Sequence, residues 1–261
     1  MNTSKKRTRK QRSYINVPNL FTALNIFCGF VSVIQTIEGN YVTAAWLIFF
    51  SAVFDALDGR IARATGQSNE FGLQMDSLGD VLSAGLAPAV LVYMMQLKTL
   101  HPPVGLIVAF FPVLFAAFRL ARFNVFTMAE GKKADYLGLP APMAGVTLAS
   151  CVILADSAEW TMLLRGLVVI VPVISLLMAS TIRYEGFPRF SIREKGSNRL
   201  KLLFFITVFI LFLIYPSYVL FPFMVLYILI GIVNAVRSLL RGGDNGEIAI
   251  IPEADELSSD R

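Results

Sequence analysis

Charged residues are scarce in this chain. Asp, Glu, Lys and Arg together make up only 16% of its 261 residues, whereas 56% are hydrophobic. That composition lies outside the usual range of soluble domains. Several apolar runs of roughly 17 to 24 residues are each long enough to cross a hydrocarbon layer of about 30 Å as a helix. The composition therefore predicts an all-α, polytopic membrane protein and argues against a soluble domain.

Cysteine and histidine are almost absent as well. Cys28 and Cys151 lie in apolar segments without CxxC spacing, so packing is favoured over pairing or metal binding. The only histidine, His101, falls in a turn on the side opposite the candidate site described below. The sequence also lacks a Walker-type phosphate loop. A zinc site and a catalytic imidazole are therefore not expected.

The hydropathy pattern predicts eight membrane-spanning helices, of which the fifth and seventh are short. The resulting membrane domain, residues 18–240, follows a basic arm, 1–17, that is expected to contact anionic lipid and not nucleic acid. An acidic tail, 241–261, contains glycine and is expected to be disordered. The predicted spans are 18–38, 41–64, 76–97, 104–126, 142–158, 162–182, 201–216 and 217–237.

Basic residues are distributed unevenly between the two sides of this predicted bundle. If the N-terminus is cytosolic, all 23 Lys and Arg residues fall on the cytosolic side except Lys98 and Arg165. An excess of this sign is what the positive-inside rule describes. We therefore expect a multi-pass membrane protein with both termini in the cytosol.

Four aspartates interrupt the second and third apolar segments. Asp55 and Asp58 are three residues apart, and Asp76 and Asp80 are four apart, so each pair shares a helix face. An antiparallel hairpin would set the four carboxylates against one another. One aspartate in a bilayer-embedded helix costs about 2.5 to 3.5 kcal/mol on insertion scales. Four like charges also repel until protons or cations intervene, which indicates a divalent cation.

The four aspartates also indicate which metal ions can bind and at what depth in the membrane they would lie. Carboxylates without nearby His or Cys select Mg²⁺, Mn²⁺ or Ca²⁺, and clusters of them often hold two ions for phosphoryl chemistry. At 1.5 Å per residue, Asp55 lies about 21 Å along its helix from Tyr41, near the cytosolic interface. Gly59 and Ala62 leave room for a substrate or let helices pack closely. Arg63 could pair with a phosphate or extend to the interface.

These residues belong to a longer pattern of fixed spacing. The pattern has eight fixed positions: Asp55-x2-Asp58-Gly59-x2-Ala62-Arg63-x8-Gly72-x3-Asp76-x3-Asp80. It resembles, without departure, the signature of the CDP-alcohol phosphatidyltransferase family. Three further segments are similar to one branch of that family, the CDP-diacylglycerol–serine O-phosphatidyltransferases: PNLFTALNIFCGF (18–30), FRLARFN (118–124) and YLGLPAP (136–142).

The resemblance implies a helical-bundle fold, a reaction and a set of roles. The hydroxyl of L-serine would attack the phosphate of CDP-diacylglycerol that carries the diacylglycerol, giving phosphatidylserine and CMP. Asp80 would be both a metal ligand and the base for the serine proton, and the protein would form a homodimer. Two Mg²⁺ or Mn²⁺ ions would be bound by Asp55, Asp58, Asp76 and Asp80, and the cytidine diphosphate would be lined by Gly59, Ala62, Arg63 and Gly72.

Polar residues on the first and fourth spans are further candidates. Arg119 and Arg122 are three residues apart and could clamp the serine carboxylate or a phosphate together with Asn124, although arginines at an inner helix end are also expected from topology. Asn19, Thr22 and Asn25, spaced three apart, could bond to nucleotide, although helix N-capping by Asn19 and interhelical hydrogen bonds are also expected.

Two alternatives remain open. The same reaction could use glycerol 3-phosphate, inositol or inositol phosphate as acceptor, but these acceptors would require additional basic residues in the site. An ether lipid could also be the donor. A divalent-cation or proton-coupled transporter would also use intramembrane aspartates. Transporters, however, usually place their site near the bilayer midplane in repeated, broken helices, and the sequence shows no such repeat.

Overall fold

The computed structural model describes residues 17–65, 70–130, 137–182, 184, 207 and 210–240. The basic arm before residue 17 and the tail 241–261 lie outside this range. A π-helical turn, η1 (Val81–Leu86), joins α3 to α4, and a 3-10 turn, η2 (Leu97–Thr99), follows α4. The α-helices are α1 (Val17–Ile37), α2 (Tyr41–Thr65), α3 (Glu70–Asp80), α4 (Ala87–Met95), α5 (Pro102–Glu130), α6 (Ala141–Ser157), α7 (Thr161–Ala179) and α9 (Pro216–Leu240).

Six helical segments are long and apolar enough to cross a membrane: α1, α2, the continuous α3–η1–α4 segment, α5, α7 and α9. With the shorter apolar helix α6, they account for seven of the eight predicted spans. Half of the remaining predicted span, 201–216, lies outside the described residues, which include only 207 and 210–216 of it. The expected class, a polytopic helical membrane protein, is confirmed.

The third span begins earlier than the hydropathy pattern predicts. Helix α3 starts at Glu70, whereas the predicted span starts at residue 76. The first turns of α3, EFGLQM, mix apolar side chains with Glu70, Gly72 and Gln74, so the hydropathy pattern does not mark where the helix begins. This extension places Gly72 on the helix and in register with Asp76 and Asp80.

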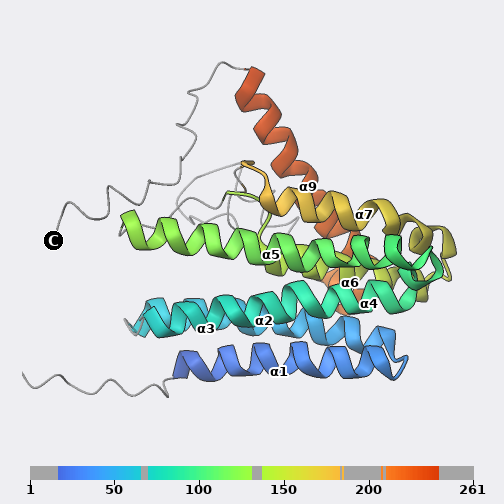
Figure 1. Cartoon of the computed structure of the whole chain (residues 1–261), viewed down its shortest axis with the longest axis horizontal. Coiled ribbons are helices and arrows are strands. Elements are labelled where there is room, and N and C mark those ends of the chain that lie inside the picture. The colour runs from blue at the N-terminus through green and yellow to red at the C-terminus, as the bar shows by residue number, and fades with distance from the viewer. Residues whose placement is uncertain are drawn as a thin grey trace, which may run out of the picture.

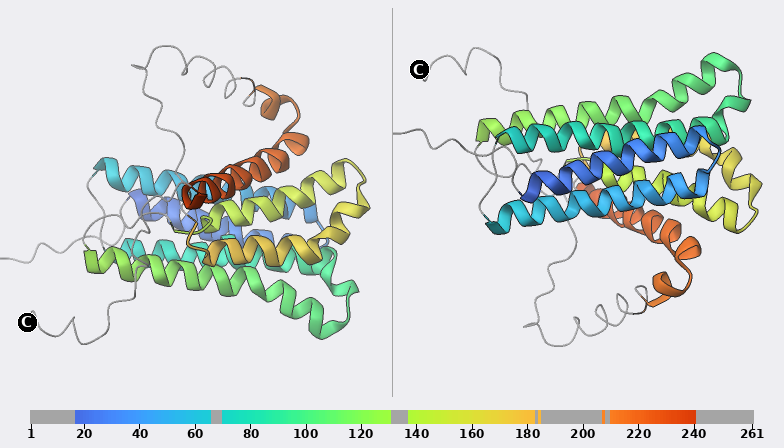
Figure 2. Two further views of the ribbon diagram at one scale, coloured as in Figure 1. Left: turned by 90° about the horizontal axis from the view of Figure 1, so that it is seen from above. Right: turned by 90° about the horizontal axis from the view of Figure 1, so that it is seen from below.

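The helices form a bundle with three of the connecting turns gathered at one end. Figure 1 shows α1, α2, the α3–α4 segment and α5 running side by side, with α9 inclined to them. The turns that join α1 to α2, α4 to α5 and α6 to α7 gather at one end, and both views in Figure 2 agree with this arrangement. The opposite end holds the start of α1, the end of α2, the start of α3 and the end of α5.

Helix α6 forms the centre of the packing. Buried side chains lie all around it, and it contacts α2, α4, α5, α7 and α9. Leu148 and Cys151 face the cluster shared with α5 and α7, whereas Ala149 and Val152 face the cluster shared with α2. A helix that is apolar on all sides is typically a buried one. Cys151 is a free, buried thiol, as is Cys28, in agreement with the expectation that both pack and do not pair.

Helix α1 approaches the π-helical turn closely at a glycine. A Cβ atom on Gly29 would lie 2.8 Å from the Cα of Ser83, so a side chain there would push the two segments apart. The π-helical turn directly follows Asp80, and such turns occur frequently at functional sites. The glycine contact therefore holds α1 within hydrogen-bonding reach of the carboxylates on α2 and α3.

Candidate active site

A pocket of about 360 Å³ lies at the end of the bundle away from the three gathered turns. Its walls come from α1, α2, α3, α5 and the start of α6. The pocket collects most of the site residues predicted from sequence and leaves out Asn25, Arg122 and Asn124. Lining it are Asp55, Asp58, Gly59, Ala62, Arg63, Gly72, Asp76, Asp80 and Arg119.

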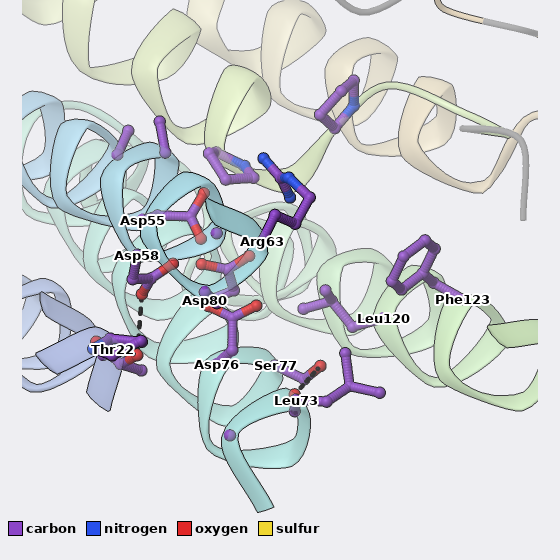
Figure 3. A pocket seen from close by; sticks show the side chains of 18 of the residues that line it. Thr22, Asp55, Asp58, Arg63, Leu73, Asp76, Ser77, Asp80, Leu120 and Phe123 are labelled. Carbon is purple, nitrogen blue, oxygen red and sulfur yellow. Dashed lines mark hydrogen bonds between the residues drawn. The ribbon is translucent and has the colours of Figure 1, made fainter. Parts of the chain in front are cut away.

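Three carboxylates converge within this pocket. Asp55 on α2 and Asp76 and Asp80 on α3 each present an oxygen, and these oxygens all lie within 4.8 Å of one another. Figure 3 shows Asp58 beside them, so the hairpin of α2 and α3 brings all four aspartates together. The i, i+3 spacing on α2 and the i, i+4 spacing on α3 are what place each pair on the facing side of its helix.

Helix α1 orients two of the four carboxylates. Thr22 donates its hydroxyl to Oδ2 of Asp58 at 2.9 Å, and Asn25 donates its amide to Oδ1 of Asp80 at 3.3 Å. Both donors are buried. Sequence spacing left open whether these side chains bond to nucleotide or to other helices, and the structure shows interhelical bonds. Asp58 is thereby tied to α1 and is set slightly apart from the other three carboxylates.

The donor set fits a divalent cation. Within the described residues, the pocket lining contains neither histidine nor cysteine, so the ligands are hard oxygens that suit Mg²⁺, Mn²⁺ or Ca²⁺ and not zinc. Oδ1 of Asp76 is buried and has no hydrogen-bond partner among those residues. Buried polar atoms are rarely left unsatisfied because the loss of hydration is costly. A cation bound between Asp55, Asp76 and Asp80 would satisfy this oxygen.

The wall formed by α2 and the start of α3 combines small residues with one cation. A Cβ atom on Gly59 would lie 3.3 Å from Nη1 of Arg63, so the glycine leaves space for the guanidinium one turn further along α2. Ala62 and Gly72 add little bulk to the same wall. This side of the pocket can therefore accept a large group that presents a phosphate to Arg63.

The wall formed by α5 and α6 is only partly predictable from sequence. Arg119 was predicted, and it lines the pocket while being only 6% exposed. Pro140, Pro142 and Met143 line it too, although no role was predicted for them. Pro140 and Pro142 belong to the YLGLPAP segment, which resembles one branch of the family. That resemblance does not show that the segment lies beside the pocket.

Arg122 and Asn124 bond elsewhere. Arg122 donates to the backbone carbonyls of Leu137, Ala179 and Ser180 at 3.0, 3.1 and 3.2 Å. Asn124 donates to Ser77 at 3.0 Å, and Ser77 itself lines the pocket. Residues three apart on a helix still differ by about 60° around its axis. That rotation is enough for Arg119 to line the pocket while Arg122 points to the end of α7.

Comparisons with known proteins find relatives that match most of the chain. The CDP-diacylglycerol–serine O-phosphatidyltransferase of Helicobacter pylori strain J99 is 36% identical over 230 residues, which cover 86% of this chain and 92% of that protein. The archaetidylserine synthase of Methanothermobacter thermautotrophicus is 36% identical over 178 residues, or 67% and 72% of the two chains. Residues 15–174 match the family model described as CDP-alcohol phosphatidyltransferase. With that match spanning the signature, the pocket and both of its walls, the chain belongs to the CDP-alcohol phosphatidyltransferase family.

Proposed function

We propose that the protein transfers the phosphatidyl group of CDP-diacylglycerol to the hydroxyl of L-serine, giving phosphatidylserine and CMP. The observation that carries the proposal is the convergence of Asp55, Asp76 and Asp80 within 4.8 Å in a pocket that also contains Arg63 and Arg119. The choice of serine is supported by two relatives named CDP-diacylglycerol–serine O-phosphatidyltransferase, which match most of the chain.

Metal binding would be the task of the four aspartates. Two Mg²⁺ or Mn²⁺ ions bound there would offset the charge of the pyrophosphate and of the leaving CMP. Asp55 and Asp76 face each other across the hairpin, and Thr22 fixes the carboxylate of Asp58. Proton transfer and substrate binding would be carried out by side chains of the protein.

Asp80 would take the proton from the serine hydroxyl. Its Oδ1 accepts the hydrogen bond from Asn25, so Oδ2 is the oxygen left to accept a proton. A carboxylate held in this way is a suitable general base when the attacking hydroxyl is within hydrogen-bonding reach. Asn25 therefore sets the direction in which Asp80 presents its second oxygen.

Each wall of the pocket would bind a different substrate. Gly59, Ala62, Arg63 and Gly72 would line the cytidine diphosphate, with Arg63 paired to a phosphate. Arg119 on the opposite wall would bind the serine carboxylate. Arg122 and Asn124, which share the FRLARFN segment with Arg119, would act on the site indirectly because they do not line the pocket.

The orientation in the membrane is also part of the proposal. The basic residues concentrate at the ends of the spans that carry the pocket, which supports a cytosolic site with both termini in the cytosol. CDP-diacylglycerol would then enter from the bilayer and serine from the cytosol. The homodimer that the family resemblance implies stays a prediction.

An acceptor screen tests the proposed reaction. Purified protein with CDP-diacylglycerol and Mg²⁺ or Mn²⁺ should release CMP and form phosphatidylserine when serine is supplied. Glycerol 3-phosphate, inositol and inositol phosphate should give little product, since the pocket lining offers only two arginines, among the described residues, for their charged or bulky groups. Release of CMP with one of these acceptors but not with serine would contradict the proposal. Divalent-cation flux into proteoliposomes without CMP formation would instead indicate a transporter.

A further inference from the structure

Arg122 caps the C-terminal end of helix α7. The last carbonyls of a helix have no partner within it, and a cation at that end also interacts favourably with the helix dipole. The guanidinium of Arg122 reaches the carbonyls of Ala179 and Ser180 there and, with the same group, the carbonyl of Leu137 before α6. One side chain of α5 thus ties two other parts of the chain together.

Backbone contacts join the same two segments a second time. The amide of Gly138 donates to Ile182 at 2.9 Å, and the amide of Leu139 donates to Leu177 at 2.9 Å. Gly138 has φ +80°, and a Cβ atom there would collide with the carbonyl oxygen of Met178. Only glycine therefore fits without strain. We call this assembly of Arg122, residues 137–139 and residues 177–182 the α7 brace.

The pocket wall begins where the brace ends. Leu139 is fully buried and is followed directly by Pro140, which lines the pocket together with Pro142 and Met143. Arg119, one turn before Arg122 on α5, lines the same wall. Figure 3 shows Leu120 and Phe123, also from α5, on the side of the carboxylates opposite Thr22. A shift of the brace would therefore displace the α5–α6 wall and leave the α1–α2 side in place.

We propose that Arg122 is a positioning residue for the acceptor: with Gly138 it holds the α5–α6 wall in place and so sets the affinity for serine without touching serine. The inference rests on the proposed function, in which Gly59 and Arg63 bind the CDP part. In phosphoryl transfer the attacking oxygen lies in line with, and opposite to, the leaving group. The wall across the carboxylates from the CDP-binding residues is then the one that bounds the acceptor.

Two chemically unlike substitutions test the brace. Arg122→Lys retains the charge, but a single ammonium cannot reproduce the fork that reaches three carbonyls. Gly138→Ala leaves Arg122 unchanged and disturbs the same brace from its other side. Both should raise the KM for serine about tenfold, because small displacements of a binding wall cost this much or more, and should leave the KM for CDP-diacylglycerol within about twofold.

Gly39→Ala is the matched control. Gly39 also has a positive φ, +85°, but it lies in the α1–α2 turn at the other end of the bundle, where a Cβ atom would meet nothing within 4 Å. This variant carries the same kind of backbone strain and should leave both KM values unchanged. If Arg122→Lys raises the serine KM while Gly138→Ala behaves like the control, Arg122 is a direct ligand and the proposal is overturned. Equal losses for both substrates would overturn it as well.

Amide hydrogen exchange tests the brace without any turnover. In Arg122→Lys, the amides of Gly138 and Leu139 should exchange at least about tenfold faster than in the parent protein, since their bonds to Ile182 and Leu177 would open more often. The Gly39→Ala protein should show no change at these amides. Unchanged exchange in Arg122→Lys would refute the brace. If the parent protein lacks serine-dependent activity but exchange responds as expected, the proposed function fails while the brace stands.

Discussion

Asp80→Asn should lower the rate of CMP release by about 10³-fold or more. General-base catalysis alone typically contributes 10²- to 10⁴-fold, and this substitution also removes a charged metal ligand. Asparagine has nearly the same shape and keeps a carbonyl oxygen that can accept the amide of Asn25, so the packing around position 80 should survive. The measurement is steady-state CMP release with saturating serine and CDP-diacylglycerol.

The control for Asp80→Asn is the same chemical change outside the pocket. Asp156 is exposed near the end of α6, in the region of the α6–α7 turn, and Asp156→Asn should retain full activity. Comparable melting temperatures for both variants and the parent protein would show that the loss is chemical and not due to unfolding. Near-normal CMP release by Asp80→Asn would contradict its role as the base.

Removal of divalent cations should abolish the reaction completely. Asp55, Asp76 and Asp80 bring three carboxylates within 4.8 Å, an arrangement that is repulsive unless cations or protons are present. Chelation should reduce CMP release to background, and added Mg²⁺ or Mn²⁺ should restore it because both prefer oxygen ligands. Zinc should restore it poorly, since the pocket offers no histidine or cysteine ligand among the described residues.

Asp55→Asn distinguishes loss of metal from any other effect of the chelator. With one ligand charge removed, the variant should need a higher concentration of Mg²⁺ or Mn²⁺ for half-maximal activity than the parent protein. The expected shift is about one to two orders of magnitude, similar to that seen on loss of a metal's supporting groups. Undiminished turnover in the presence of excess chelator would exclude a metal-assisted mechanism.

Much of the fold follows from hydropathy and helical periodicity. The bounds of α1 and α2 agree with the predicted spans within a residue or so, because apolar runs flanked by polar turns define both ends. The convergence of the aspartates also follows, since their spacing permits one shared face on each helix. The early start of α3 does not, because its first residues mix polar and apolar side chains and give no sharp hydropathy boundary.

Sequence periodicity shows which residues share a face but not what that face meets. Thr22 and Asn25 were correctly grouped, yet their bonds to Asp58 and Asp80 depend on how α1 docks at Gly29. Arg122 was grouped with Arg119, and only the position of the α7 end shows where its guanidinium bonds. Hydropathy likewise cannot separate a lipid-facing helix from a buried one, so the central place of α6 was not foreseen.

The central claim is that the carboxylates of α2 and α3 jointly bind divalent ions. Its most direct measurement is an anomalous-scattering map from crystals of the protein grown with Mn²⁺. We expect a strong peak between Asp55, Asp76 and Asp80, with carboxylate oxygens of all three within about 2.5 Å of the ion. A map with Mn²⁺ bound elsewhere and none at these side chains, or with their oxygens turned away from one another, would contradict the account.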